Sequence, residues 1–439
     1  MTGMGVPGVE DVAALARWLR ARDVTAEGGM PEVRLIAGGR SNLTYRLDFP
    51  PAGSASAAGS GAGAATATGA ATAAGSGAAA GVATAAGAAS AAAAAPGSSP
   101  DAPRPLVLRR PPLGHVLPTA HDMGREFRVL SALHGTAVPV PRPLALCEDE
   151  SVIGAPFYVM EWVDGVVLRT REDAEAITPA QATEISQRFI TMLATIHGVD
   201  LGAVGLEKFG RPEGYLARQL ARWQRQWELS VTREVPGYDE LVQRLAAGLP
   251  ASGATRATSP PRATSPTRAT NAAGLPAANG GPAGTLVHGD FRIDNMLLTL
   301  GTGPAIAAVV DWEMSTLGDP LADLGLTLVY WIDPGEEDLL DYSGRGGLTA
   351  APGFLKRADL AERYAEATGR DLSRLGYYMA FGCFKLAVVL EGIHARFLQH
   401  KTVGEGFDRQ GEAVPTLIER AHRLLDTGKQ GHLGGHDPG

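Results

Sequence analysis

The sequence predicts an α+β protein with a small, mostly β N-terminal lobe and a larger helical C-terminal lobe. Alternating apolar residues, which are typical of strands, gather in the first third of the 439-residue chain, and helical spacing dominates the rest. Two low-complexity segments, 51–104 and 250–284, are too poor in large apolar residues to build a core, so we expect disordered insertions there. About 350 residues remain outside them, which is enough for one large or two modest domains.

The chain divides into four predicted regions around these insertions. We expect an N-terminal helix in 1–29, an N-lobe in 30–160 that carries the first insertion, a C-lobe in 161–427 that carries the second, and a flexible tail in 428–439. The second insertion contains basic Ser/Thr-Pro repeats, which suit a solvated linker and, as the alternative, phosphorylation sites or an anion-binding tether.

The N-terminal segment predicts an amphipathic surface helix. Val12, Leu15, Trp18 and Leu19 recur at helical spacing among charged side chains. The segment lacks the basic start and apolar run of a signal peptide, and the Ala-rich run in 87–95 is too short and too weakly apolar for a membrane span. We therefore expect a cytoplasmic protein with no membrane role.

Net charge and cysteine content narrow the class of protein further. The formal net charge of −8 argues against a general nucleic-acid binder, which needs a basic face. Cys147 and Cys383 cannot form a disulfide framework and have no metal-ligand spacing. We expect two reduced thiols, as is usual in a cytosolic protein.

The N-lobe begins with a predicted hairpin over residues 33–49. Its apolar residues alternate, and Gly38 and Gly39 break the pattern at a turn that also contains Ser41 and Asn42. Two further strands are expected at 106–109 and 157–160, so the first insertion lies in a loop between paired strands. Such a loop is tolerable because the entropy of loop closure grows slowly with length. The alternating residues of the hairpin are Val33, Leu35, Tyr45, Leu47 and Phe49.

The strand at 106–109 has two distinct faces. Period-two alternation places Val107 and Arg109 on one face and Leu106 and Leu108 on the other. Arg110 then points away from Arg109, and we expect it to reach solvent.

Helical spacing recurs through the remainder of the chain. The first such helix carries Glu126 beside an apolar face made by Met123, Phe127, Leu130 and Leu133. The expected helices are 119–134, 179–197, 214–229, 356–367, 371–397 and 414–427.

The stretch from His288 to Leu298 carries the chemistry. Asp290 and Asn295 lie five residues apart on a loop that precedes an apolar, strand-like run, and Asp311 ends the next apolar strand. Phosphoryl transfer needs such a set, because one carboxylate receives the proton of the attacking hydroxyl while an amide oxygen and a second carboxylate hold Mg²⁺ against phosphates.

At these residues the chain resembles the aminoglycoside phosphotransferase family, the small-molecule branch of the protein-kinase-like fold. HGDFRIDN, residues 288–295, resembles the catalytic loop of that family. The resemblance implies a protein-kinase-like bilobal fold with ATP and Mg²⁺ as cofactors. It implies that Asp290 is the catalytic base, that Asn295 and Asp311 are Mg²⁺ ligands, and that His288 supports the loop.

The resemblance also implies roles in the N-lobe. Gly38, Gly39 and Ser41 would bring backbone amides to the nucleotide phosphates, although any hairpin turn favours glycine. Arg109 stands where the family has a lysine that points into the nucleotide cleft, and Glu126 stands where the family has its carboxylate partner. This departure from lysine leaves phosphate binding in question, since arginine and lysine are not equivalent.

The adenine-binding hinge of the family is matched by Met160, Glu161 and Val163, for which an ordinary strand end is the alternative. Asp319 and Asp323, in a segment that resembles GDPxxDL, are expected to be structural, bonding backbone amides and capping the next helix. We expect His197 to be a packed core histidine.

The branch of the family is indicated by LRRPP at 108–112 and AHDMGREF at 120–127, which resemble phosphotransferase domains found fused to or encoded beside acyl-CoA dehydrogenases. This implies a hydroxyacyl acceptor and a functional link to such a dehydrogenase. Three arginines near Trp223 would suit an anionic acceptor, while Trp223 and Trp227 themselves suit either the core or an acceptor pocket. These arginines are Arg218, Arg222 and Arg225.

Three alternatives remain open. The first is a non-catalytic nucleotide or acyl-CoA binding pseudokinase, which Arg109 in place of lysine would favour. The second is an aminoglycoside-type antibiotic kinase. The third is a protein kinase. The sequence after Asp311 argues against it, because Gly318-Asp319-Pro320 follows where an activation loop would lie.

Overall fold

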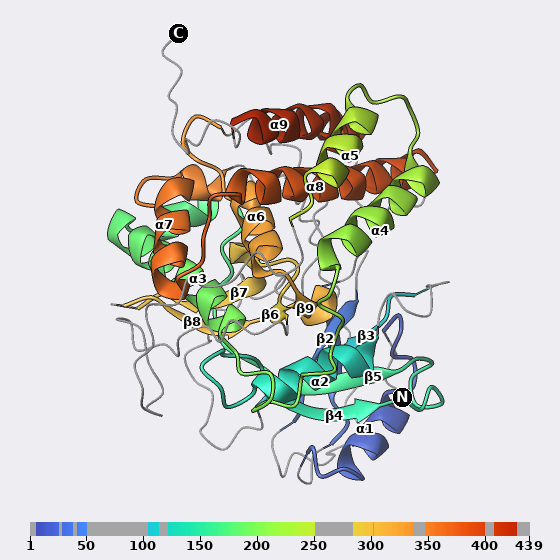
Figure 1. Cartoon of the computed structure of the whole chain (residues 1–439). Helices are drawn as coiled ribbons and strands as arrows, with labels where there is room; N and C mark the ends of the chain where they lie inside the picture. The colour runs from blue at the N-terminus through green and yellow to red at the C-terminus, as the bar shows by residue number, and fades with distance from the viewer. Residues whose placement is uncertain are drawn as a thin grey trace, which may run out of the picture.

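The computed structural model shows a bilobal molecule in which a β-rich lobe lies beneath a helical lobe (Figure 1). Two parts of the sequence-based prediction fall outside the described residues: Gly38, Gly39 and Ser41, and the tail 428–439. The two insertions also lie outside them apart from their end residues. The structure describes residues 6–25, 29–37, 42–50, 104–113, 122–250, 284–301, 303–336, 347–399 and 408–427.

The N-lobe is built on a five-stranded antiparallel sheet with the strand order β1-β2-β3-β5-β4. Strands β2 and β3 pair in continuous register from Leu43 opposite Arg110 to Leu47 opposite Leu106, so the first insertion connects two neighbouring strands as predicted. The strands are β1 Glu32–Ala37, β2 Leu43–Asp48, β3 Leu106–Arg110, β4 Pro143–Cys147 and β5 Phe157–Glu161.

A helix covers each face of this sheet. Helix α1 (Val12–Arg20) packs with Leu106 and Leu108 in one apolar cluster, and α2 (Met123–Leu133) packs with Val107 in the main core. Because the two faces of β3 meet two different clusters, the predicted alternation over 106–109 is confirmed.

One detail of the N-lobe prediction is wrong. Arg110 is buried rather than solvated, because its guanidinium donates to the carbonyl oxygens of Gly8 and Ile153. The N-terminal segment before α1 folds back over β3 and supplies one of these acceptors. Leu35, on the edge strand β1, is exposed, and the β1–β2 register is irregular between Leu35 and Ala37.

The C-lobe is organised around one long buried helix, α8 (Leu375–Leu398), which packs against α4, α6 and α9 (Figure 1). Helix α8 is long and apolar enough to cross a membrane by length and composition, but most of it is enclosed by the other helices. Both cysteines are free and buried. The other helices of this lobe are α3 Pro179–His197, α4 Tyr215–Ser230, α5 Tyr238–Ala247, α6 Pro320–Tyr330, α7 Arg357–Thr368 and α9 Ala413–Thr427.

Two small antiparallel strand pairs lie where the lobes meet and position the motif residues (Figure 1). Strand β6 (Thr285–Val287) pairs with β9 (Thr316–Gly318), and β7 (Met296–Thr299) pairs with β8 (Ala305–Val309). The loop 288–295 therefore leaves β6 and enters β7, and Asp311 follows β8. Short 3₁₀ turns span Glu172–Ala176, Ile293–Asn295, Trp312–Met314, Leu348–Ala350 and Asp408–Glu412.

Candidate active site

The loop between β6 and β7 is held by the carboxylate of Asp323, on α6. The amides of His288 and Gly289 donate to its two oxygens at 2.7 and 2.9 Å. Gly289 has φ of +84°, and a Cβ there would lie 2.6 Å from the carbonyl oxygen of Met314. Glycine is therefore required at this position, which brings the chain into Asp290 at a fixed angle.

His288 joins this loop to the segment that carries Asp311. Its Nδ1 accepts from the amide of Asp290 at 3.3 Å, and its Nε2 lies 3.1 Å from the carbonyl oxygen of Val310. The neutral tautomer with its proton on Nε2 satisfies both contacts. The ring thus ties the two chain segments together and does not face an open site, because the residue is fully buried.

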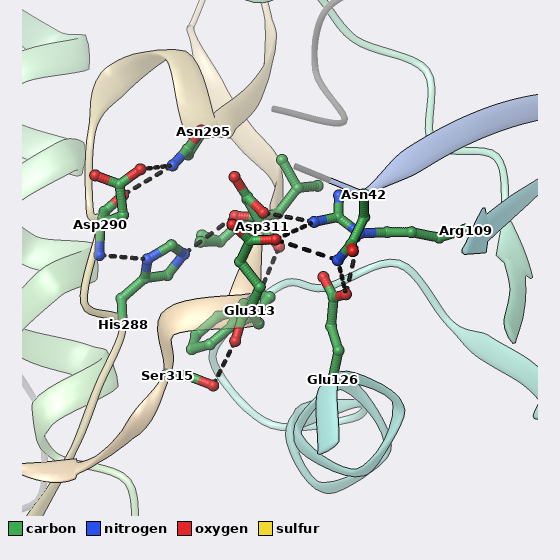
Figure 2. A network of polar contacts seen from close by, with 12 residues as sticks. Asn42, Arg109, Glu126, His288, Asp290, Asn295, Asp311, Glu313 and Ser315 are labelled. Carbon is green, nitrogen blue, oxygen red and sulfur yellow. Dashed lines mark hydrogen bonds and ion pairs between the residues drawn. The ribbon is translucent and has the colours of Figure 1, made fainter. Parts of the chain in front are cut away.

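Asp290 and Asn295 interact directly, as Figure 2 shows. The Asn295 side-chain amide donates to the backbone oxygen of Asp290 at 2.8 Å and lies 3.4 Å from its carboxylate. Arg292 adds a positively charged contact, with its Nε 3.5 Å from Asp290 Oδ2. The carboxylate of Asp290 is thereby oriented while part of it stays accessible.

The opposite end of the Asn295 side chain fits a metal ligand. With its NH₂ group committed to Asp290, its Oδ1 is buried and has no hydrogen-bond partner. An orphaned amide oxygen of this kind is an oxygen donor that a hard cation such as Mg²⁺ prefers. Among the described residues no group of three His, Cys, Asp or Glu side chains forms a metal site by itself.

Asp311 occupies a left-handed backbone conformation with φ of +67°, which is uncommon for a residue with a side chain. Strain of this kind persists where the surrounding structure fixes a side chain for function. The conformation turns the carboxylate toward the N-lobe, where it meets Arg109 (Figure 2).

Arg109 is the centre of a buried charge cluster between the lobes. Its Nε donates to Glu126 at 3.0 Å, and its Nη2 donates to Asp311 at 2.6 Å and to Glu313 at 3.5 Å. One guanidinium therefore meets three carboxylates, and all of these groups except Glu313 are almost fully buried. Burial alone would lower the pKa of Arg109, but the surrounding carboxylates outweigh it and raise the pKa.

The excess of carboxylates over cations in this cluster affects the pKa of Glu126. Burial, reinforced by the neighbouring carboxylate of Asp311, raises the pKa of Glu126 despite the contact with Arg109. A divalent cation beside Asp311 would balance the local charge, because three carboxylates and one guanidinium sum to two negative charges when ionised. The charge balance and the orphaned amide oxygen of Asn295 both fit a Mg²⁺ ion at this place.

Asn42, which follows the predicted glycine turn, contributes its side chain to the cluster. Its Nδ2 lies 3.2 Å from Glu313 and 3.4 Å from Glu126. The segment 42–48 is therefore tied both to α2 and to the C-lobe. Tyr158, which pairs with Arg109 across β3 and β5, also interacts with Glu126 through its hydroxyl.

The expected hinge residues lie at the end of β5, where the sheet leads into the C-lobe. Met160 is buried opposite Val107, and the backbone amide of Glu161 donates to the carbonyl oxygen of Arg142 at 2.9 Å. Val163 packs in a small apolar cluster with Val310 and neighbouring residues.

Behind the loop, His197, Asp323 and Tyr364 form a buried hydrogen-bonded cluster, which we call the clasp. His197, at the end of α3, lies 2.7 Å from the Tyr364 hydroxyl through Nδ1 and 3.2 Å from Asp323 through Nε2. Burial lowers the pKa of His197, so it is neutral at pH 7. Asp319 caps α6 by accepting from the amide of Leu321 at 3.0 Å. The structural roles expected for these residues match this arrangement.

Sequence reasoning assigned no role to several residues that the structure places at the site. Glu313 follows Asp311 by two positions, and Arg292 lies within the loop motif 288–295. Their closeness to the motif residues in the sequence is a signal that could have identified both. Tyr158 and Lys385 had no local signal, because only the sheet register and the packing of α8 bring them to the site.

Trp223 and Trp227 are both buried, and Trp227 stacks on Tyr238 with ring centroids 4.0 Å apart.

Comparisons with known proteins agree with this geometry. The family model described as "Phosphotransferase enzyme family" matches residues 99–360. Acyl-CoA dehydrogenase family member 10 of Mus musculus is 32% identical over 321 residues, 73% of this chain and 27% of that protein. Acyl-CoA dehydrogenase family member 11 of Gallus gallus is 32% identical over 323 residues, 72% of this chain and 37% of that protein. The chain thus spans about a third of the length of these relatives.

A solved structure is similar along nearly the whole chain. It is a crystal structure of a candidate aminoglycoside phosphotransferase from Ralstonia eutropha JMP134, with 29% identity, a TM-score of 0.65, and coverage of 95% of this chain and 98% of that one. This likeness confirms the predicted protein-kinase-like bilobal fold.

Proposed function

Since the chain belongs to the phosphotransferase enzyme family, we propose that it moves the γ-phosphate of ATP to a hydroxyl group of a small molecule. The observation that carries this proposal is the convergence of Asp290, Asn295 and Asp311. The first two share one loop and a hydrogen bond, and His288 joins that loop to the carbonyl oxygen immediately before Asp311.

Each residue has a proposed task in the transfer. Asp290 accepts the proton of the acceptor hydroxyl as the hydroxyl oxygen bonds to the γ-phosphorus. The bond from that phosphorus to the bridging oxygen of ATP breaks at the same time, and ADP leaves. Asn295 Oδ1 and a carboxylate oxygen of Asp311 would hold Mg²⁺. When bound, the ion neutralises charge on the phosphates. His288, through its contacts to Asp290 and Val310, keeps the two segments in register.

The N-lobe residues are proposed to bind the nucleotide. The backbone of Gly38, Gly39 and Ser41 would approach the phosphates, and the Arg109–Glu126 pair would place a cation beside them. The backbone at Met160, Glu161 and Val163 would bind adenine. The described geometry supports the Arg109–Glu126 part of this assignment most directly.

We propose a hydroxyacyl derivative, such as a CoA ester, as the acceptor class, in preference to an antibiotic. Support comes from the curated relatives, which are named as acyl-CoA dehydrogenase family members and which the chain matches over about a third of their length. A functional link to an acyl-CoA dehydrogenase follows as part of the same proposal. We place the protein in the cytoplasm, which suits its two free, buried cysteines.

The test is γ-phosphate transfer measured across hydroxyacyl-CoAs, sugars, choline and aminoglycosides. We expect turnover with at least one hydroxyacyl-CoA and a loss of about 10²- to 10⁴-fold in kcat for Asp290→Asn, with ATP binding retained. Equal inactivity of both proteins across the panel, with ATP still bound, would exclude the enzymatic function.

A second candidate, a nucleotide-binding pseudokinase, is favoured by one observation. The guanidinium of Arg109 contacts the carboxylate of Asp311 at 2.6 Å, so it occupies an oxygen that a metal ion would use. Thermal-shift titration with Mg-ATP separates the candidates. Stabilisation that Asp311→Ala leaves unchanged, combined with absent turnover, supports the pseudokinase; stabilisation that this variant abolishes supports metal-dependent binding.

A further inference from the structure

Lys385 is a cation from the C-lobe at the loop that carries Asp290. It lies within α8 and is the one charged residue between Leu375 and Leu390. Its Nζ donates to the carbonyl oxygen of Gly289 at 2.8 Å. Because Gly289 directly precedes Asp290, the amine of Lys385 lies beside the proposed catalytic base.

The amine of Lys385 retains hydrogen-bonding capacity. An ammonium group has three N–H donors, and the Gly289 oxygen uses one of them. Within the described part of the chain no carboxylate forms an ion pair with Lys385. The two acids that interact electrostatically with Lys385 already have partners. Asp290 faces Arg292 and Asn295, and Asp323 faces His197 and the loop amides.

A second cation lies on the same side of the site. The amine of Lys385 is 5.5 Å from the ring centroid of Trp223, and the guanidinium carbon of Arg222 is 5.4 Å from the same ring. Arg222 is exposed, and among the described residues it forms no ion pair with a carboxylate. Two cations therefore lie close to one aromatic ring. Burial is the main cause of the lowered pKa of Lys385; Asp290 and Asp323 oppose this shift, and the positive charge of Arg222 adds to it.

We propose that Lys385, with Arg222 at the same Trp223 ring, is an acceptor-binding subsite for an anionic oxygen group of the acceptor, a carboxylate or a phosphate. An anion would take up the remaining N–H donors of Lys385 and relieve the repulsion between the two cations. The same charges disfavour a polycationic acceptor such as an aminoglycoside. This inference rests on the proposed phosphotransferase function and specifies its acceptor.

The test uses two matched pairs of hydroxyl compounds that differ in charge. One pair is 3-hydroxyhexanoate and 1,3-hexanediol, and the other is glycerol 3-phosphate and glycerol, so that carboxylate and phosphate are distinguished. Binding to the full chain is measured by calorimetry without nucleotide, and kcat and KM are measured separately with Mg-ATP. The variants are Lys385→Met, Lys385→Arg and, as the matched control at an exposed lysine, Lys208→Met.

We expect the wild type to bind the anionic member of at least one pair tenfold or more tightly than the neutral member. Lys385→Met should bring the ratio within about threefold, and Lys385→Arg should keep most of the preference because it keeps the charge. Lys208→Met should behave as the wild type. The change should fall mainly in the acceptor KM, whereas a merely structural role would lower the melting temperature and kcat together.

Two results would overturn the subsite: equal or absent binding of both members of each pair by the wild type, or a preference that survives in Lys385→Met. Its failure is distinguishable from failure of the proposed function. Selective binding without phosphate transfer keeps the subsite and removes the enzyme, whereas transfer without selectivity keeps the enzyme and removes the subsite.

Discussion

Arg109 shows how a single residue can join two lobes. Its guanidinium reaches Glu126 on α2 and both Asp311 and Glu313 beyond β8, so one side chain bridges residues that lie up to 204 positions away. A guanidinium can bond several carboxylates at once because its donors are spread over a planar fork. Lysine, which presents one amine, cannot serve three acids in the same way.

We predict that Arg109→Ala destabilises the protein by about 3–5 kcal/mol, because it leaves buried carboxylates without their cation. Arg109→Lys should lose less. Urea denaturation in metal-free buffer measures both. Arg188→Ala is the control, since it removes an exposed pair with Glu184 and should cost under about 1 kcal/mol. Equal midpoints for Arg109→Ala and the control would contradict the prediction.

Gly289 offers a second test at the scale of one residue. We predict that Gly289→Ala lowers both the melting temperature and kcat, because a Cβ would clash with the backbone oxygen of Met314 and displace Asp290. Gly205→Ala is the matched control, with φ of +70° and no atom within 4 Å of the added Cβ. The control carries only the cost of the left-handed conformation, about 1–2 kcal/mol. Equal losses in the two variants would show that the clash is relieved.

Among the elements, the loop 288–295 depends on the contact between α3, α6 and α7. His197 ends α3, Asp323 lies in the first turn of α6, and Tyr364 lies on α7. Because Asp323 also binds the loop amides, helix packing in the C-lobe sets the position of Asp290.

This clasp predicts a pH dependence of stability. Burial holds the pKa of His197 below its ordinary value of 6.5, so below that pH the unfolded chain gains a proton that the folded chain does not. The free energy of unfolding should therefore fall as the pH drops from 7 toward 5, by at most about 1.4 kcal/mol per pH unit from this residue.

Urea unfolding between pH 5 and pH 8 measures the effect. His197→Gln should flatten the slope over that window, and His134→Gln, at an exposed site, should leave it unchanged. A slope of wild-type size in His197→Gln would assign the dependence to other groups.

At the scale of the whole molecule, the two lobes share one polar junction surrounded by apolar packing. The main core extends from α2 and the inner face of the sheet through α3 to α8, so the lobes are not separately packed units. The first insertion joins β2 and β3, whose register is complete without it.

We predict that replacing residues 53–102 with a short Gly-Ser loop changes the melting temperature by no more than a few degrees, because the paired strand ends already lie side by side. Thermal unfolding followed by circular dichroism measures this, with the full chain as the reference. Loss of the cooperative transition would show that the segment is part of the fold.

The bilobal architecture, most helices and the loop motif could be predicted from the residues alone, because periodicity and residue order are local properties. The helix α5 and the strands β4, β6 and β9 were missed, since their patterns are short, and β4 also begins at a proline. Nothing local marked the burial of Arg110, the contact of Arg109 with Asp311, or the approach of Lys385 to Gly289. These three contacts depend on the folded arrangement, because each joins elements that are distant in the chain, and packing selects which charged groups share a buried site.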